Sequence, residues 1–120
     1  MLFRSCLLDG ARVARLRLRD AAIATSGAGE QFVLIDGQRY GHVLDPRTGW
    51  PASGVLSATV VTRDAALADA LSTAILVEGP ALATRYCNCH PDTLVLMTLD
   101  NDPDRTSVVG GCRGALIEEE

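Results

Sequence analysis

The sequence predicts an α+β fold with a mostly antiparallel sheet, one main amphipathic helix over about residues 64–77 and a shorter second helix. Three observations predict it. Short runs of β-branched and apolar residues recur along the chain and are separated by turn residues. One longer run rich in Ala and Leu has apolar side chains at helical spacing and ends at Gly79-Pro80. No internal repeat or low-complexity segment is present, which favours a globular domain.

Length and composition define the class of protein. The chain has 120 residues, the size of one domain with a modest core, so we expect residues 1–120 to form a single domain. An apolar fraction of 48% and a charged fraction of 22% are typical of a folded globular protein. The net charge is −4 and the basic residues form no run, so we expect no general nucleic-acid binding.

The N-terminal segment contains Arg4 and Cys6 but lacks the sustained apolar stretch of a secretory signal. No apolar run approaches the roughly 20 residues that cross a bilayer. We therefore expect no membrane span and a cytoplasmic location.

The first predicted strand covers residues 11–19, where apolar residues alternate with arginines. A second apolar run, residues 21–24, leads into two hydroxyl residues, Thr25 and Ser26, and then into Gly27, Ala28 and Gly29. This composition predicts a turn. Two interpretations are open: a plain turn, or a turn whose backbone N–H groups approach a phosphate or another anion.

A hairpin is predicted next. Residues 31–35 and 39–44 are β-prone, and Asp36-Gly37 between them is typical of a tight hairpin turn. The return strand leads directly into the most polar loop of the chain.

In that loop, Asp45-Pro46 forces a turn, because proline fixes its own φ and restricts the residue before it. His42 precedes the turn and is either a general base or a structural histidine. Arg47 follows the turn and either clamps a phosphate in bidentate fashion or ties the loop to Asp45 or Asp64.

The main helix follows a strand over residues 55–62, which we expect to be buried on one face. Asp64 is a good N-cap, because its carboxylate can accept from the free N–H groups of the first turn. Residues 65–77 then have helical periodicity, and Gly79-Pro80 ends the helix. The predicted core face consists of Leu67, Leu71, Ala74 and Ile75.

The remainder of the chain is predicted as a short helix over residues 80–86 and strands over residues 93–99 and 106–109. A turn at residues 101–104 separates the strands, and an acidic tail, residues 118–120, follows them.

Two groups of side chains have the character of metal ligands. The first lies on one face of the main helix, and its carboxylate and hydroxyl oxygens suit Mg²⁺ or, alternatively, form a solvated helix edge. The second contains soft ligands, but no fourth ligand is evident, so we do not expect a zinc site. The first group is Asp69, Ser72 and Thr73, and the second is Cys87, Cys89 and His90.

Three motifs together resemble the ApbE family, the FAD:protein FMN transferases. They are Ala-Thr-Ser-Gly at residues 24–27, His-Val-Leu-Asp-Pro-Arg-Thr-Gly at residues 42–49 and Ala-Asp-Ala-Leu-Ser-Thr-Ala at residues 68–74. The similarity runs over about residues 16–79 and is to the C-terminal half of the family's domain. It implies a Mg²⁺-dependent enzyme that cleaves the FAD pyrophosphate, transfers FMN to a threonine of a target flavoprotein and releases AMP.

The resemblance also implies roles for individual residues. His42 matches the proposed base, and Leu44 matches a position whose backbone contacts FAD. Many family members have a second aspartate where Ser72 stands. The implied metal ligands are Asp69, Ser72 and Thr73, and the implied cofactor-binding residues are Thr25, Ser26, Gly27, Leu44, Arg47 and Thr48.

Full family members are more than twice as long, and their preceding half supplies most of the FAD pocket and a further metal ligand. We therefore expect a partial or truncated member, which either needs a second chain to supply the other half, has lost activity, or is a fragment of a larger gene product. The alternative is a non-catalytic flavin- or metal-binding module or interaction remnant. A sheet divided in this way is expected to expose an edge and an apolar face.

Overall fold

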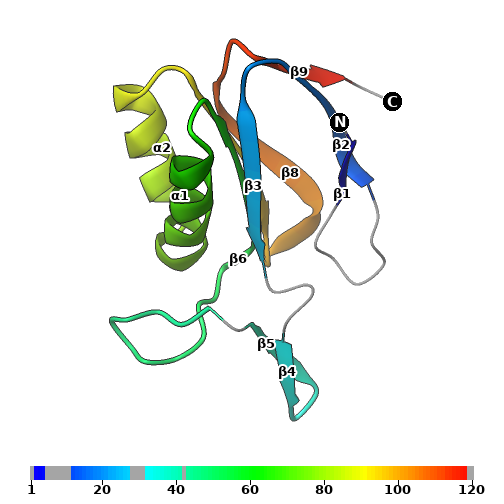
Figure 1. The fold of residues 1–120 in the computed structure, drawn as a ribbon. Coiled ribbons are helices and arrows are strands. Elements are labelled where there is room, and N and C mark those ends of the chain that lie inside the picture. The colour runs from blue at the N-terminus through cyan, green and yellow to red at the C-terminus, as the bar shows by residue number, and fades with distance from the viewer. Residues whose placement is uncertain (1, 5–11, 28–31, 42, 119–120) are drawn as a thin grey trace.

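Four antiparallel strands form the central layer of the protein, in a computed structural model that describes residues 2–4, 12–27, 32–41 and 43–118 (Figure 1). Two helices cover one face of this sheet, and a second, three-stranded sheet lies on its other side. The predicted α+β class is therefore confirmed. The central sheet has the order β3 (Ala22–Gly27), β6 (Val55–Thr62), β7 (Thr93–Leu99) and β8 (Asp102–Gly111).

The remaining elements flank this layer. The helices are α1 (Ala65–Glu78) and α2 (Pro80–Cys89). The second sheet has the order β1 (Leu2–Arg4), β2 (Arg12–Leu18) and β9 (Ala115–Glu118). A separate two-stranded hairpin consists of β4 (Phe32–Ile35) and β5 (Gln38–Gly41).

The core has two parts, one on each face of the central sheet. On the helix side, residues such as Val60, Val95 and Ile75 pack together and are fully buried. On the other side, Leu16 of β2 packs with Val61 and its neighbours from β7. This arrangement corrects the prediction that residues 55–62 bury one face only: seven of the eight residues of β6 are buried, because β6 has a layer on each side.

The predicted start of the main helix is confirmed. The Asp64 carboxylate accepts from the backbone N–H of Ala66 at 2.9 Å and of Leu67 at 3.3 Å. The predicted core face is wrong at two positions, because Leu67 is 37% exposed and Ala74 is exposed. The buried face instead combines two small residues, Ala68 and Ser72, with three large apolar ones. The buried side chains are Ala68, Leu71, Ser72, Ile75 and Leu76.

Other boundaries differ at the ends of elements. The second helix continues to Cys89, and the return strand of the hairpin ends at Gly41, after which Leu44 forms an isolated bridge to Pro51. Strand β8 begins at Asp102, before the predicted residue 106, and pairs with β7 almost from the turn. Strands β1 and β9 were not predicted.

The β4–β5 hairpin has the predicted turn. Asp36 and Gly37 both have positive φ, of 51° and 80°, which is the geometry of a type I′ turn. The hairpin extends away from the central layers (Figure 1), and Leu34 and Ile35 on it are 64% and 50% exposed. It is therefore a protruding element with apolar side chains on its surface.

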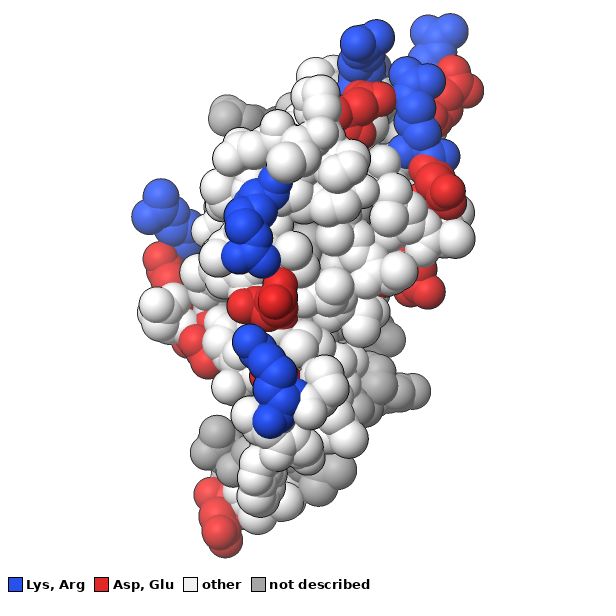
Figure 2. All heavy atoms as spheres, turned by 90° about the vertical axis from the view of Figure 1, so that its left-hand side faces the viewer, with Lys and Arg blue, Asp and Glu red and all other residues white. Residues whose placement is uncertain are grey.

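Charges of both signs are interspersed on the helix-bearing side, with mostly uncharged surface between them (Figure 2). Two of the ion pairs join Arg85 to Glu78 at 3.3 Å and Arg47 to Asp45 at 2.8 Å. Within the described ranges, neither helix has the length and apolar character needed to cross a membrane.

Candidate functional site

Strand β3 brings the first motif against the third. The Ser26 hydroxyl oxygen lies 3.0 Å from the Ser72 hydroxyl and 2.9 Å from the Thr73 hydroxyl, both on helix α1. Ser26 faces α1 because alternate residues of a strand point to opposite sides, and Ala24, two residues earlier, packs in the helix-side core. Two motifs that are 46 residues apart in the sequence are therefore in direct contact.

The predicted turn at Thr25, Ser26 and Gly27 is wrong. These residues continue β3 and lie opposite Thr59, Ala58 and Ser57 of β6. The Thr25 side chain points away from the helices, and its hydroxyl lies 2.8 Å from that of Thr59. The ladder with β6 outweighs the glycine-rich composition, and residues 28–31 of the same stretch lie outside the described part of the chain.

The polar residues of α1 divide into an exposed and a buried set. Asp69 and Thr73 are exposed, whereas Ser72 is fully buried. The Ser72 hydroxyl donates to the Asp69 carbonyl at 2.9 Å, and the Thr73 hydroxyl reaches the same carbonyl at 3.3 Å. The three side chains therefore do not form one solvated helix edge, because Ser72 is buried between α1 and the sheet.

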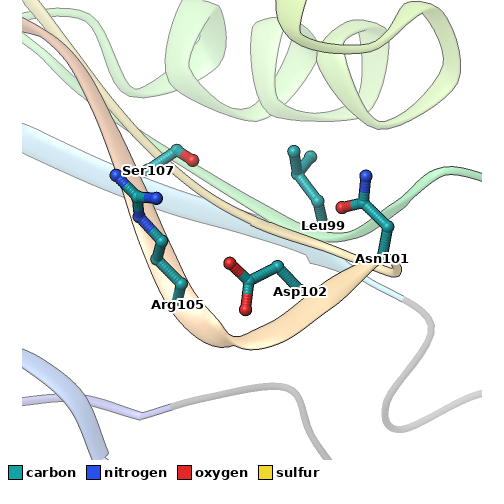
Figure 3. A pocket seen from close by; sticks show the side chains of 5 residues that line it. All are labelled: Leu99, Asn101, Asp102, Arg105 and Ser107. Carbon is teal, nitrogen blue, oxygen red and sulfur yellow. The ribbon is translucent and has the colours of Figure 1, made fainter.

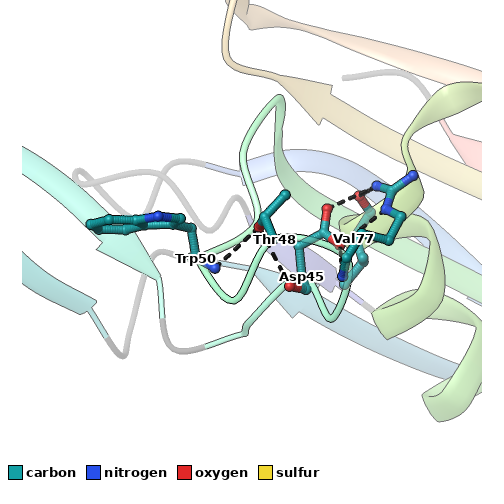
Figure 4. A network of polar contacts seen from close by, with 5 residues as sticks. Asp45, Thr48, Trp50 and Val77 are labelled. Carbon is teal, nitrogen blue, oxygen red and sulfur yellow. Dashed lines mark hydrogen bonds and ion pairs between the residues drawn. The ribbon is translucent and has the colours of Figure 1, made fainter.

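The second motif forms a tight loop around the Asp45 carboxylate (Figure 4). The Arg47 guanidinium donates to it through Nε at 3.0 Å and Nη2 at 2.8 Å, and the Arg47 backbone N–H donates at 2.9 Å. These hydrogen bonds hold the pKa of Asp45 below its ordinary value, and the carboxylate raises the pKa of Arg47. The Thr48 and Gly49 N–H groups donate to the Asp45 carbonyl at 3.1 and 2.8 Å. Of the two interpretations of Arg47, the one in which it ties the loop to Asp45 matches these hydrogen bonds.

The same loop contacts the C-terminal turn of α1. Arg47 Nη2 donates to the Val77 carbonyl at 3.4 Å (Figure 4). A guanidinium is favourable there, because the carbonyl end of a helix carries partial negative charge. Val43 packs against the helix-side core, while Leu44 and Trp50 are 57% and 67% exposed. The Asp-Pro loop and the polar face of α1 thus belong to one region of the molecule.

His42, the predicted base, lies outside the described residues. Its neighbours Gly41 and Val43 lead from β5 into the Asp-Pro loop. Its role stays a prediction.

The cysteine-rich segment at the end of α2 has a packing role. Cys87 is buried, its thiol lies 3.5 Å from the Thr93 carbonyl, and burial raises the pKa of the thiol. His90 stacks on Tyr86 with ring centroids 4.0 Å apart, and Cys89 is exposed. Where the structure describes the chain, no three or more His, Cys, Asp and Glu side chains gather as a metal cluster.

Two features were missed from the sequence. One is Asp92, whose carboxylate accepts from Arg63 Nε at 2.8 Å and from the Arg113 backbone N–H at 2.7 Å. The other is a hollow of about 350 Å³ at the β7–β8 turn (Figure 3). Asp92 has no local sequence signal, because both of its partners are distant in the sequence. The hollow lies within one predicted hairpin, but no motif marks it. The hollow is lined by Leu99, Asn101, Asp102, Arg105 and Ser107.

Comparison with known proteins identifies the class. Residues 6–97 match the ApbE family. The FAD:protein FMN transferase of Vibrio cholerae is 38% identical over 84 residues, which are 68% of this chain and 25% of that protein. The FAD:protein FMN transferase of Escherichia coli K12 is 31% identical over 99 residues, or 82% of this chain and 28% of that protein. The chain belongs to the ApbE family, as the three motifs predicted.

Solved structures agree in fold. The flavin transferase ApbE from Vibrio cholerae has a TM-score of 0.69 and 31% identity, over 92% of this chain and 35% of that chain. The ApbE protein from Thermotoga maritima has a TM-score of 0.61 and 38% identity, over 74% of this chain and 28% of that chain. The chain thus spans about a quarter to a third of the length of these relatives.

Proposed function

We propose that this chain is the part of an FAD:protein FMN transferase that contributes the metal-binding helix and one wall of the flavin-nucleotide site. The observation that carries this proposal is the convergence of three motifs on α1. Ser26 contacts its polar face, Asp69 and Thr73 lie exposed on that face, and Arg47 contacts its last turn. Residues 1–120 are proposed to form one domain.

The donor set of α1 fits Mg²⁺. A carboxylate and a hydroxyl oxygen are hard ligands, and both residues are exposed. Mg²⁺ usually takes few protein ligands and completes its coordination with water and substrate phosphates, so a dense acidic cage is not required. Asp69 and Thr73 would hold the ion, whereas the side chain of Ser72 is fully buried.

The chemistry assigned to the chain is the transfer of FMN from FAD to a threonine hydroxyl, with AMP as the leaving product. Mg²⁺ bound at α1 would neutralise charge on the FAD pyrophosphate. His42 would take the proton from the acceptor threonine. The residues proposed to orient the flavin nucleotide are Ser26, Gly27, Leu44, Arg47 and Thr48, with Thr25 acting through its backbone because its side chain points away from the helices.

A second chain is proposed to complete the site. Large apolar side chains are exposed in the Asp-Pro loop and on the hairpin. Such surfaces are typical of a contact with another protein. They are formed by Leu34, Ile35, Leu44 and Trp50.

Activity is tested by incubating the chain with FAD, Mg²⁺ and a target flavoprotein domain. Transfer gives a fluorescent, flavin-labelled target and free AMP, and Asp69→Ala and His42→Ala should abolish both. Repeating the reaction with a separate chain that covers the missing part of a relative distinguishes a half-site from an inactive protein. Neither AMP nor labelled target in both reactions would exclude the transferase function.

A non-catalytic flavin- or metal-binding role is the second candidate, since the exposed carboxylate and hydroxyl of α1 are sufficient for binding without turnover. Calorimetry with Mg²⁺ and FAD distinguishes it, because binding without turnover gives heat but no AMP. Asp69→Ala should lose the Mg²⁺ heat, while Asp100→Ala, which removes another exposed carboxylate, should not. Equal heats for the wild-type chain and Asp69→Ala would remove any metal role for Asp69.

A further inference from the structure

Three hydroxyl groups and one carbonyl form a closed set of contacts between β3 and α1. Ser26 lies 2.9 Å from Thr73 and 3.0 Å from Ser72. The Asp69 carbonyl lies 2.9 Å from the Ser72 hydroxyl and 3.3 Å from the Thr73 hydroxyl. Ser26 is the member of the set that comes from the sheet.

The number of protons limits how these contacts are made. Each hydroxyl donates one proton, and the carbonyl only accepts, so three protons cannot fill four contacts at once. The longest contact, from Thr73 to the Asp69 carbonyl, is the weakest of the four. Leaving it out gives one ordered chain in which Thr73 donates to Ser26, Ser26 to Ser72, and Ser72 to the Asp69 carbonyl.

We propose that Ser26 is a positioning residue, which accepts a hydrogen bond from the Thr73 hydroxyl and so leaves the Thr73 oxygen lone pairs free for a divalent cation. This inference rests on the proposed Mg²⁺ role of Asp69 and Thr73. In the same arrangement the buried Ser72 accepts from Ser26 and anchors it to the helix backbone. The buried Ser72 thus supports Ser26 and does not bind the cation. The exposed Asp69 and Thr73 are the ligands of the cation.

Strand β3 makes Ser26 suitable for this role. Its backbone is fixed by the β3–β6 ladder, where Ser26 lies opposite the buried Ala58. A threonine in a helix divides between two rotamers, one of which bonds the carbonyl four residues earlier. Thr73 is in that rotamer, with its hydroxyl 3.3 Å from the Asp69 carbonyl and 2.9 Å from the Ser26 hydroxyl. The Ser26 hydroxyl therefore adds a fixed acceptor that favours this rotamer further and turns the Thr73 proton away from the carbonyl.

The test is a titration of the 120-residue chain with Mn²⁺, followed by electron paramagnetic resonance, together with NMR couplings that report the Thr73 side-chain rotamer without metal. Ser26→Ala should weaken Mn²⁺ binding about tenfold, the lower end of the range for residues that orient metal ligands. It should also give averaged Thr73 couplings. Ser26→Thr, which keeps the hydroxyl, should restore both.

Thr59→Val is the matched control, because it removes a hydroxyl from the Thr25–Thr59 pair on the opposite face of the sheet. It should leave Mn²⁺ affinity and the Thr73 couplings unchanged. Ser26→Cys is the second variant if Ser26→Ala does not fold, since a thiol has similar size but is a weak acceptor. It should shift both readouts in the same direction as Ser26→Ala.

The outcomes separate this inference from the proposed function. Mn²⁺ affinity within about twofold of wild type in Ser26→Ala, with wild-type Thr73 couplings, would overturn the positioning role and leave the metal site in place. Equal Mn²⁺ binding by wild type and Asp69→Ala, or no binding by either, would overturn the metal role of α1 and this inference with it.

Discussion

Two carboxylates, Asp45 and Asp92, hold different parts of the molecule by similar contacts that span different distances along the sequence. Each accepts from an arginine side chain and from a backbone N–H. The donors of Asp45 come from Arg47, two residues away. The donors of Asp92 come from Arg63 and Arg113, which are 29 and 21 residues away.

The difference determines what each carboxylate stabilises. Asp45 stabilises one loop, and its partner Arg47 stays close to it along the chain even when the rest of the protein is unfolded. Asp92 joins the end of β6, the start of β7 and the segment after β8, which meet only in the folded protein. We therefore expect changes near Asp92 to affect global stability and changes near Asp45 to affect the local loop.

The largest effect is expected from Gly110→Ala, at the Asp92 end of the sheet. Gly110 has φ of 73°, and an added Cβ would overlap the Thr93 carbonyl oxygen and lie 2.9 Å from the Cys87 sulfur. Strain and overlap together should cost about 3 kcal/mol in urea unfolding. Gly111→Ala is the control, because nothing lies within 4 Å of its Cβ, and it should cost about 0.5 kcal/mol or less. A similar loss of stability in both variants would show that crowding at Gly110 is not the cause.

Asp92→Asn should lower the urea midpoint by less than Gly110→Ala and by more than Asp45→Asn. The amide keeps the size of the side chain but weakens the charge-assisted bonds from Arg63 and Arg113. Asp45→Asn weakens bonds that join residues only two apart, so it changes the free energy of unfolding little. Equal midpoints for the two variants would show that the long-range contacts of Asp92 have no special weight.

The pH dependence of stability sharpens the same comparison. Hydrogen bonds, from the Arg113 N–H first and then Arg63, lower the pKa of Asp92, and those of Arg47 lower the pKa of Asp45. A carboxyl with a lowered folded pKa stabilises the fold above its ordinary value of 3.8, and this is lost as the pH falls through the lowered pKa. The Asp45–Arg47 contact can persist in the unfolded chain, so its linkage is smaller. Below pH 4, the free energy of unfolding should therefore depend less steeply on pH in Asp92→Asn than in Asp45→Asn.

Predictability from sequence follows the same division between local and long-range contacts. The strand over residues 55–62, the Asp64 cap and the Asp36-Gly37 turn were predicted because neighbouring residues determine them. The core face of α1 was partly wrong: Leu71 and Ile75 are buried as predicted, but Ala68 and Ser72 are buried where Leu67 and Ala74 were expected. The short strands β1 and β9 lack a periodic pattern long enough to detect.

The candidate site shows the same limit. The motifs that compose it could be recognised in the sequence, but the contact of Ser26 with α1 could not, because it joins residues 46 and 47 positions apart. The turn predicted at Ser26 was wrong for the same reason: pairing with β6 outweighs local glycine content. Asp92 carries no local signal either, since both of its partners are distant in sequence.

The smallest effect on stability is expected from Arg47→Ala, because an exposed ion pair contributes little to the free energy of unfolding. Its effect should be local. Arg47 links the Asp-Pro loop to the Val77 carbonyl. The single tryptophan, Trp50, lies in the same loop, where its backbone N–H donates to the Thr48 hydroxyl at 3.1 Å. Time-resolved fluorescence anisotropy should show faster Trp50 motion in Arg47→Ala at an unchanged urea midpoint. Arg85→Ala, which removes the ion pair between α2 and Glu78 at the end of α1, should change neither. Unchanged Trp50 motion in Arg47→Ala would mean that the loop is held by its backbone hydrogen bonds alone.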